Sequence, residues 1–240
     1  MIRAAALFVA VLTGSAASAV TCETVGFEGL SYSVCDVDPA RDELALFLRR
    51  GDGTGLGSFA ALAAERPEQT LRFAMNAGMY HPDRRPVGHY VQDGVEVMRL
   101  LTNESPGNFG LLPNGVLCLT DDSARVYETL AFAEAAPACR DATQSGPMLV
   151  IDGALHPRFL ADSDSRFIRN GVGTSDAGDR AVFVISDQAV SFHEFGRFFR
   201  DGLGLPQALY FDGRISRLYA PDLGRNDAGF AMGPMIGVFE

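Results

Sequence analysis

The segment ATQSGPMLVIDGALHPRFLADSDSRFIRNGVGTSD, residues 142–176, decides how this chain folds. Its apolar run Met148–Ile151 lies between Gly146-Pro147 and Asp152-Gly153, and short apolar runs bounded in this way are typical of strands between turns. We therefore predict a turn at Gln144–Pro147, a strand at Met148–Ile151, a tight turn at Asp152-Gly153 and, after a polar connection, a second glycine-rich turn.

This arrangement places several polar side chains at the ends of strands. Loops at strand ends can hold hydrogen-bonding groups around a ligand because the strands fix their position. The residues concerned are Gln144, Ser145, Arg169 and Asn170.

Short strands outnumber helices in the rest of the chain. Alternating or buried apolar runs predict strands at 25–38, 43–48, 71–75, 116–119, 207–211 and 233–239. Helical spacing predicts helices at 58–66, 129–136 and 194–201, the first with Ser58 as its N-cap. We predict hairpins at 91–101, around Asp93-Gly94, and between 179–186 and 189–192, around Asp187-Gln188. The expected fold class is α+β, a single domain with a mixed β-sheet core and a few helices.

Residues 1–19 have the pattern of a secretory signal peptide. One positive charge, Arg3, precedes an apolar run, and Ala17-Ser18-Ala19 forms a small-residue cleavage site. We therefore expect a domain at 20–240, exported to the periplasm or the extracellular space. A buried N-terminal helix is the alternative. No other apolar run approaches the about 18 residues needed to cross a bilayer, so we expect no stable membrane anchor.

Four cysteines lie beyond this segment, and an even number in an exported chain favours disulfides. Three pairings are possible. We expect Cys22 with Cys35 and Cys118 with Cys139, since each pair brackets a short segment that can fold back on itself. A zinc site is disfavoured because the spacings are not Cys-x-x-Cys and no histidine lies near any of the four.

The formal net charge of -10 argues against nucleic acid as a partner, because a phosphate backbone needs a basic face. Every basic residue apart from histidine is arginine, which excludes Schiff-base chemistry on a lysine. An anionic substrate would require a local arginine cluster within this acidic chain. We expect no cofactor, and no feature of the sequence indicates an oligomeric state.

Three separated motifs resemble those of the phosphodiester glycosidase family. They are Asn76-Ala77-Gly78-Met79-Tyr80, the segment around Gln144–Pro147 and Arg169–Gly173, and Tyr210–Ser216. They occur in family order, and the resemblance extends from about Phe73 to the C-terminus. It implies a phosphorylated carbohydrate or glycan as substrate and hydrolysis of a glycosyl phosphodiester.

The resemblance assigns catalytic roles to Asp212 and Arg169. Asp212 ends an apolar strand and matches the acidic residue of the family's Asp-Gly-Gly-Gly-Ser motif, although Arg214-Ile215 replace two of its glycines. A carboxylate would serve as nucleophile or as base, against an oxocarbenium-like transition state. Arg169 matches the arginine of Arg-Thr-Ala-Ile-Gly, and a guanidinium fits two phosphate oxygens. The alternatives are a structural Asp-Gly turn, and an ion pair of Arg169 with Asp164 or Asp176. Arg166 is a second candidate.

The remaining motif positions are expected to orient the sugar and the phosphate. They are Asn76, Gly78, Ser145, Gly146, Asn170, Gly213 and Ser216. Asn76 equally fits a plain turn. Ser145 is not expected to be a nucleophile, because its flanks are not Gly-x-Ser-x-Gly. We prefer a phosphate-binding role for it, with a bare turn as the alternative.

The sequence identifies neither a convincing second carboxylate nor a metal site. Asp176 and Asp152 are possible second carboxylates. His81, Asp83 and His89 share one loop, but their spacing matches no known ligand geometry, so we expect solvated residues and no metal. His89 remains a candidate general acid, whereas His156 and His193 are expected to be surface or satisfied histidines.

We therefore expect a hydrolase, with retention or inversion undecided. The rival hypothesis is a non-catalytic module that binds polysaccharide or peptidoglycan, which the altered Asp-Gly-Arg-Ile-Ser turn favours.

Overall fold

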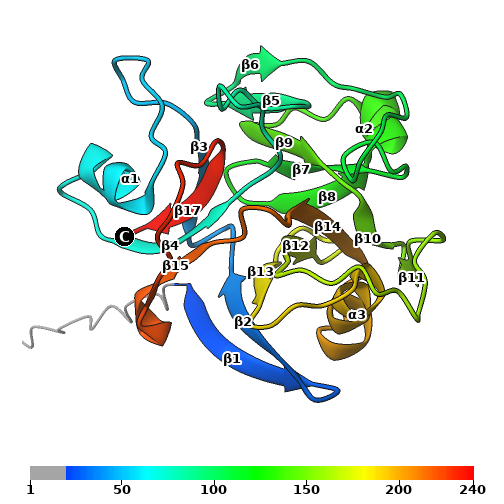
Figure 1. Ribbon diagram of the computed structural model, residues 1–240. Coiled ribbons are helices and arrows are strands. Elements are labelled where there is room, and N and C mark those ends of the chain that lie inside the picture. The colour runs from blue at the N-terminus through cyan, green and yellow to red at the C-terminus, as the bar shows by residue number, and fades with distance from the viewer. Residues whose placement is uncertain (1–19) are drawn as a thin grey trace, which may run out of the picture.

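The computed structural model describes residues 20–240, and the predicted signal peptide lies outside them. Three antiparallel sheets meet around one central core (Figure 1). The first sheet has the order β1 (Thr21–Phe27), β2 (Leu30–Val37), β13 (Ala181–Ser186), β12 (Asn170–Thr174), β14 (Gln207–Asp212), β10 (Met148–Ile151) and β11 (Ala154–Leu155). The second has the order β16 (Arg225–Asn226), β15 (Leu218–Ala220), β4 (Leu71–Asn76), β17 (Met235–Phe239) and β3 (Glu43–Phe47). The third has the order β6 (Val95–Met98), β5 (Tyr90–Gln92), β9 (Asp141–Ser145), β7 (Gly115–Leu119) and β8 (Ala124–Glu128).

The inner faces of all three sheets contribute to the central core. Phe183 and Leu209 of the first sheet, Phe73 and Ile236 of the second and Leu117 of the third belong to one buried cluster. Apolar side chains that alternate along strands produce such a core, because removal of apolar surface from water is the main favourable term in folding. The fold is therefore α+β and forms one domain, as the sequence predicted, although the strand pairs of its three sheets are antiparallel and not mixed.

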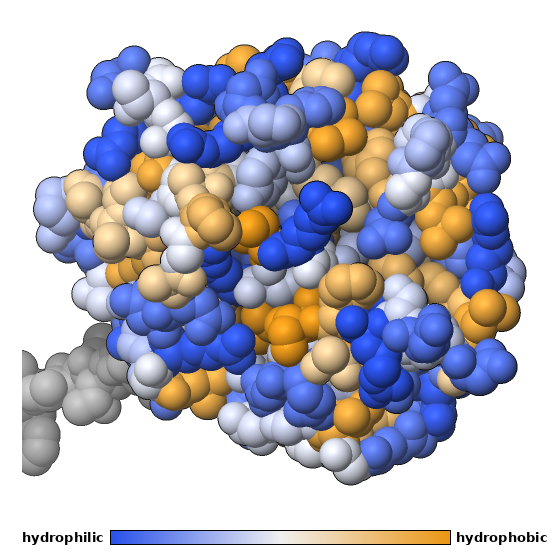
Figure 2. All heavy atoms as spheres, in the orientation of Figure 1, coloured by the Kyte–Doolittle hydropathy of each residue, from blue (hydrophilic) through white to orange (hydrophobic). Residues whose placement is uncertain are grey.

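Each helix covers the outer face of one sheet. Helix α1 (Phe59–Glu65) packs on the second sheet, α2 (Thr129–Ala135) on the third, and α3 (Phe192–Arg197) on the first. A π-helical turn, 198–202, continues α3, and a 3-10 turn, 221–223, lies between β15 and β16. The view in Figure 2 shows hydrophilic atoms over much of one face, with hydrophobic atoms gathered in recessed parts near its centre.

Both predicted disulfides are confirmed. Cys22 and Cys35 are opposite residues of the β1–β2 hairpin, and Cys118 of β7 is joined to Cys139, just before β9. Disulfides are typical of proteins that fold in an oxidising compartment. Within the described part of the chain, no helix is long and apolar enough to cross a membrane.

Two glycines place a strand where the sequence predicted a turn. Gly171 and Gly173 lie in β12, at the centre of the first sheet, and not in a second glycine-rich turn. A Cβ at Gly171 would lie 2.5 Å from the Leu209 carbonyl oxygen, and one at Gly173 would lie 2.7 Å from the Phe199 ring. These glycines therefore permit close packing.

Three further predictions were wrong. The predicted strand 25–38 is interrupted at Glu28-Gly29, where the chain turns from β1 into β2. Gln144 and Ser145 belong to strand β9, so only Gly146-Pro147 remain of the predicted turn. The segment 189–192 does not pair with β13, which lies between β2 and β12. Ser191 instead caps α3 in a capping box with Glu194, so the helix begins at Phe192 and not at residue 194.

Candidate active site

Four chain segments far apart in the sequence meet where strand β14 ends. Strands β12 and β14 are antiparallel, with Asn170 opposite Asp212, so the start of one lies beside the end of the other. Asn76 at the end of β4 and Ser145 at the end of β9 reach the same place, as the hydrogen bonds described next show. The topology thus brings the predicted site residues together.

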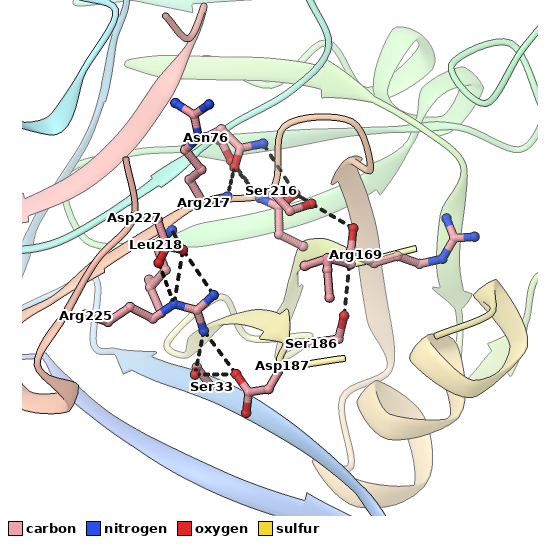
Figure 3. A network of polar contacts seen from close by, with 12 residues as sticks. Ser33, Asn76, Arg169, Ser186, Asp187, Ser216, Arg217, Leu218, Arg225 and Asp227 are labelled. Carbon is pink, nitrogen blue, oxygen red and sulfur yellow. Dashed lines mark hydrogen bonds and ion pairs between the residues drawn. The ribbon is translucent and has the colours of Figure 1, made fainter. Parts of the chain in front are cut away.

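Asn76 and Asn170 form a buried amide pair that holds the loop after β14. The Asn170 Nδ2 atom donates to the Asn76 backbone oxygen at 3.0 Å and lies 3.1 Å from the Asn76 Oδ1 atom. Asn170 Oδ1 accepts from the Asp212 amide at 3.2 Å, and Asn76 Oδ1 accepts from the Arg217 amide at 2.9 Å. Figure 3 shows Asn76 beside Ser216 and Arg217. In this structure the two asparagines position the loop.

The two candidate serines also bond to the backbone at the end of β14. Ser145 Oγ donates to the Phe211 carbonyl at 2.9 Å. Ser216 Oγ lies 2.7 Å from the Asp212 carbonyl oxygen and 3.0 Å from that of Ile168. Both hydroxyl groups therefore fix the carbonyl groups that flank the Asp212 side chain.

Two of the candidate glycines are required for close packing. Gly78 has φ +116°, and a Cβ there would lie 2.8 Å from Thr143 Oγ1. A Cβ at Gly146 would lie 2.6 Å from the Asn114 Cβ atom. Both positions bring β4, β9 and the loop before β7 close together under the site.

Asp212 and Gly213 line a cavity of about 290 Å³, a volume suited to a small ligand. The other residues lining this cavity were not predicted from the sequence. They are Met79, Asn108, Phe167, Tyr210 and Arg214. One signal could have identified Tyr210: it lies two residues before Asp212 on the same strand, and such residues share a face.

The Asp212 carboxylate forms no ion pair with the residues that the structure describes. Its Oδ1 atom accepts from the Arg214 amide at 2.9 Å. No arginine or histidine in residues 20–240 forms an ion pair with it within 4.0 Å. Burial raises the pKa of this carboxyl group, against the lowering effects of the backbone amides of residues 213–215 and of the positive charge of Arg214.

Arg169 is a buried cation, and its side chain is only partly satisfied. It is 1% exposed; its Nε donates to the Val190 carbonyl at 2.8 Å and its Nη2 to the Ser165 carbonyl at 2.9 Å. Its Nη1 has no hydrogen-bond partner. The guanidinium carbon lies 3.6 Å from the centre of the Phe192 ring, and Figure 3 shows the side chain extending away from Asn76 and Ser216.

Neither carboxylate considered as a partner of Arg169 pairs with it. Asp164 and Asp176 form no ion pair with Arg169 within the described residues, and burial lowers the pKa of the Arg169 guanidinium. The candidate Arg166 pairs with Glu194 instead, at 2.8 Å. Among the described residues, the buried charge of Arg169 is therefore balanced by carbonyl groups, aromatic faces and the Tyr210 hydroxyl group, and by no carboxylate within 4.0 Å.

Gly213 connects Arg169 with the cavity. A Cβ at Gly213 would overlap the Tyr210 hydroxyl group and would lie 3.9 Å from Arg169 Nη1. Gly213 and Tyr210 both line the cavity, whereas the Arg169 side chain lies behind them. Burial raises the pKa of the Tyr210 hydroxyl, so it is a neutral hydrogen-bond donor at the cavity wall.

The two carboxylates considered as second catalytic groups lie at the other end of the sheet. Asp152 accepts from Gln207 Nε2 at 2.6 Å, and Gln207 begins β14. Asp176 follows β12, whose last residue, Thr174, pairs with Gln207. At about 3.3 Å per residue, five residues of β14 separate this end from Asp212 by about 16 Å.

The histidines do not converge on this cavity. His89 is buried, with Nδ1 3.1 Å from the Met98 carbonyl oxygen, and lines a separate cavity with Phe132. His156 stacks on Phe159. Residues 20–240 contain no group of three histidine, cysteine or acidic side chains arranged to hold a metal ion.

A sequence profile described as phosphodiester glycosidase matches residues 69–238. The chain belongs to this family. It is 33% identical over 191 residues to the uncharacterized protein YigE of Escherichia coli K12. These residues make up 79% of this chain and 74% of YigE.

Solved structures share the fold at low sequence identity. The catalytic domain of zebrafish N-acetylglucosamine-1-phosphodiester alpha-N-acetylglucosaminidase, auto-inhibited by its pro-peptide, superposes with a TM-score of 0.64 and 13% identity. The match covers 92% of this chain and 82% of that one. A hypothetical protein from Synechocystis superposes with a TM-score of 0.61 and 15% sequence identity. That match covers 92% of this chain and 61% of the Synechocystis chain.

Proposed function

We propose that this phosphodiester glycosidase family member hydrolyses a glycosyl phosphodiester at the bond between the anomeric carbon and oxygen. The observation that carries the proposal is a separated pair of charges. In residues 20–240, Asp212 lines a cavity without an ion-pair partner within 4.0 Å, and Arg169 is buried close to the same cavity without a carboxylate within 4.0 Å. Buried charges are costly when they are not compensated, and uncompensated charges concentrate at functional sites.

Asp212 is the proposed catalytic carboxylate. It would attack the anomeric carbon or accept a proton from the attacking water, and its raised pKa suits proton transfer. The bond from the anomeric carbon to oxygen breaks, and its electron pair leaves with the phosphate oxygen. A phosphomonoester is a good leaving group, so a strong proton donor is less necessary than in ordinary glycoside hydrolysis. This fits a cavity whose lining contains one carboxylate.

Arg214 is the proposed direct contact to the phosphate. Its side chain lines the cavity, and no carboxylate in the described residues pairs with it within 4.0 Å. Arg169, which is not exposed to the cavity, would act through Tyr210 and Gly213 by supplying positive potential beneath the cavity wall. In this proposal Arg169 is a positioning residue. Arg214, and not Arg169 as predicted from the sequence, contacts the phosphate directly.

The predicted substrate-binding residues would act mainly by holding this constellation. Asn76, Asn170, Ser145 and Ser216 all bond to the backbone around Asp212, and such supporting bonds keep a catalytic group in its working orientation. We further propose that the protein is exported, which its two disulfides support.

Product analysis on a panel of sugar-1-phosphodiesters tests the function. We expect free sugar and a phosphomonoester from the wild-type protein. Release of sugar 1-phosphate would instead mean cleavage on the phosphorus side, and saturable binding without any product would support the non-catalytic module.

A further inference from the structure

The arginines of this acidic protein divide into paired and unpaired groups. Of the nineteen arginines in residues 20–240, twelve lie within 4.0 Å of a carboxylate. The seven others are Arg49, Arg84, Arg99, Arg125, Arg169, Arg214 and Arg217. Because the chain carries a formal net charge of -10, unpaired arginines gathered in one region would form a local site for anions.

Three of the unpaired arginines, Arg217, Arg84 and Arg49, lie in a row outside the cavity that Arg214 lines. Arg217 Nη1 donates to the Phe230 carbonyl. A Cβ at Gly57 would lie 3.2 Å from the Ala231 Cβ atom and 4.0 Å from Arg84 Nη1. Arg217 and Arg84 therefore flank the segment Phe230-Ala231. Arg49 lines a small cavity together with Arg84 and with Asp83, whose carboxylate is paired with Arg85. We call Arg217, Arg84 and Arg49 the basic strip.

Tyr80 connects the basic strip with the active-site cavity. Its neighbour Met79 lines that cavity, and the Tyr80 hydroxyl donates to the Ala231 carbonyl at 3.3 Å. Burial raises the Tyr80 pKa, the negative charge of Asp212 raises it further, and Arg217 and Arg84 oppose this. Tyr80 therefore lies within electrostatic reach of both the catalytic carboxylate and the strip.

The far end of the strip offers space for a ligand. Arg49 lines a second small cavity, of about 100 Å³, with His81 and Arg85. Arg85 is paired with Asp83, whereas the Arg49 side chain bonds only to the Gly53 carbonyl, at 2.8 Å. An anionic group bound here would meet the Arg49 guanidinium, which no carboxylate of the described chain occupies.

We propose that the basic strip binds additional phosphate groups of the substrate, so that the substrate is a chain of phosphodiester-linked sugars. This inference rests on the proposed function, because the cavity at Asp212 would hold the phosphodiester that is cleaved. Negative charge over the rest of the protein repels a polyanion, and the strip then supplies the favourable path to the cavity. A single sugar phosphodiester would use the cavity and leave the strip empty.

The test is equilibrium binding in an Asp212→Asn background, where substrate is not consumed. The two ligands are a labelled oligomer of four hexose units joined by 1-phosphodiesters and a single hexose phosphodiester. We expect the R49Q/R84Q double variant to lose about tenfold or more in affinity for the oligomer and less than twofold for the single unit. The slope of log affinity against log salt should fall by about one to two, because fewer counterions are released. Arg125→Gln is the control for the single variants Arg49→Gln and Arg84→Gln, because each removes one unpaired charge and Arg125, like Arg49, bonds to a backbone carbonyl.

Equal loss of oligomer binding in Arg125→Gln, or equal loss for both ligands in the double variant, would overturn the proposal. Tighter binding of an oligodeoxynucleotide with the same number of phosphates would also overturn it. Failure of the proposed function gives a different result: the wild-type protein releases no sugar from any phosphodiester, while oligomer binding still depends on Arg49 and Arg84.

Discussion

Arg225 and Arg169 are both drawn in Figure 3, yet only Arg225 is neutralised by carboxylates. Arg225 contacts Asp227 at 3.0 Å and Asp187 at 3.0 Å, and it donates to Ser33 Oγ at 2.9 Å. These bonds tie β16 to the end of β13 and to β2, so the cluster joins two sheets. Arg169 is more deeply buried and has no carboxylate at all.

The difference separates a structural use of charge from a functional one. A guanidinium whose donors meet carboxylates can be explained by the fold alone. A buried guanidinium with no carboxylate partner, and with one Nη1 unbonded in residues 20–240, also bonds to two carbonyl groups of the fold, but its charge is not explained by the fold alone. We therefore expect changes at Arg225 to lower stability without lowering turnover, and changes at Arg169 and Asp212 to lower turnover, with an added cost in stability at Arg169.

The largest expected effect belongs to Asp212→Asn. Loss of the proposed catalytic carboxylate should lower kcat/KM by on the order of 10³-fold or more, measured as free sugar released from a sugar phosphodiester. The fold should persist, because the asparagine oxygen can still accept from the Arg214 amide. Asp152→Asn is the matched control at the opposite end of β14. Similar losses of kcat/KM in Asp212→Asn and Asp152→Asn would contradict the assignment of the active site to the Asp212 end of β14.

Arg169→Met comes next, with an expected loss of about 10- to 100-fold in kcat/KM. This loss is smaller than that expected for a group that contacts the oxyanion directly, because in the proposal Arg169 does not touch the substrate. Unfolding measurements should also show a cost of about 1–3 kcal/mol, because the Val190 and Ser165 carbonyls lose their donors. Arg169→Lys, which keeps the charge, should recover part of the activity. Inhibition by inorganic phosphate should weaken in Arg169→Met, a change that loss of packing alone does not predict.

Arg225→Met should lower the free energy of unfolding and leave turnover unchanged. Asp187 and Asp227 would lose their cation, and because their side chains are partly exposed we expect a loss of about 1–2 kcal/mol in the free energy of unfolding. Urea unfolding measures it, and kcat should not change. Arg180→Met is the control: it breaks a more exposed pair with Asp36 and should cost less than about 1 kcal/mol. A fall in kcat without a fall in stability at Arg225 would contradict the comparison.

The smallest effect concerns stability and pH. Burial raises the folded-state pKa of Asp212 above its ordinary value of 3.8, so the folded state favours the protonated form. The stabilisation from this group is complete below the unfolded-state pKa and is lost as pH rises through the folded-state pKa. Asp212→Asn should therefore be more stable than the wild type at neutral pH, with the difference shrinking toward pH 3.8. Urea unfolding at both pH values measures this, and a difference that grows on acidification would be inconsistent with a desolvated carboxylate.

Apolar runs made much of the fold predictable. Met148–Ile151 and Gln207–Phe211 were predicted as strands, and both lie in the first sheet, because a run of buried residues between turn signals leaves few alternatives. The glycines of β12 could not be placed in this way. Glycine that permits close packing and glycine that permits a turn look alike in a single sequence. The start of α3 was predicted at residue 194, but it could have been predicted correctly, because Ser191 and Glu194 have capping-box spacing.

The motifs predicted which segments meet but not which side chains face the cavity. Asn76, Asn170 and Ser145 were expected to contact substrate, and the structure uses their polar groups to hold the loop after β14. Arg214 was noted only as a departure from the family motif, yet it lines the cavity. Side-chain direction at strand ends depends on tertiary contacts that no local pattern contains.

Hydrolysis of a sugar phosphodiester in water labelled with oxygen-18 tests the central claim most directly, by mass spectrometry of both products. The proposed mechanism places Asp212 against the anomeric carbon, and it predicts that the label appears in the free sugar and is absent from the phosphomonoester. Label in the phosphate would contradict this, because the site would then attack phosphorus.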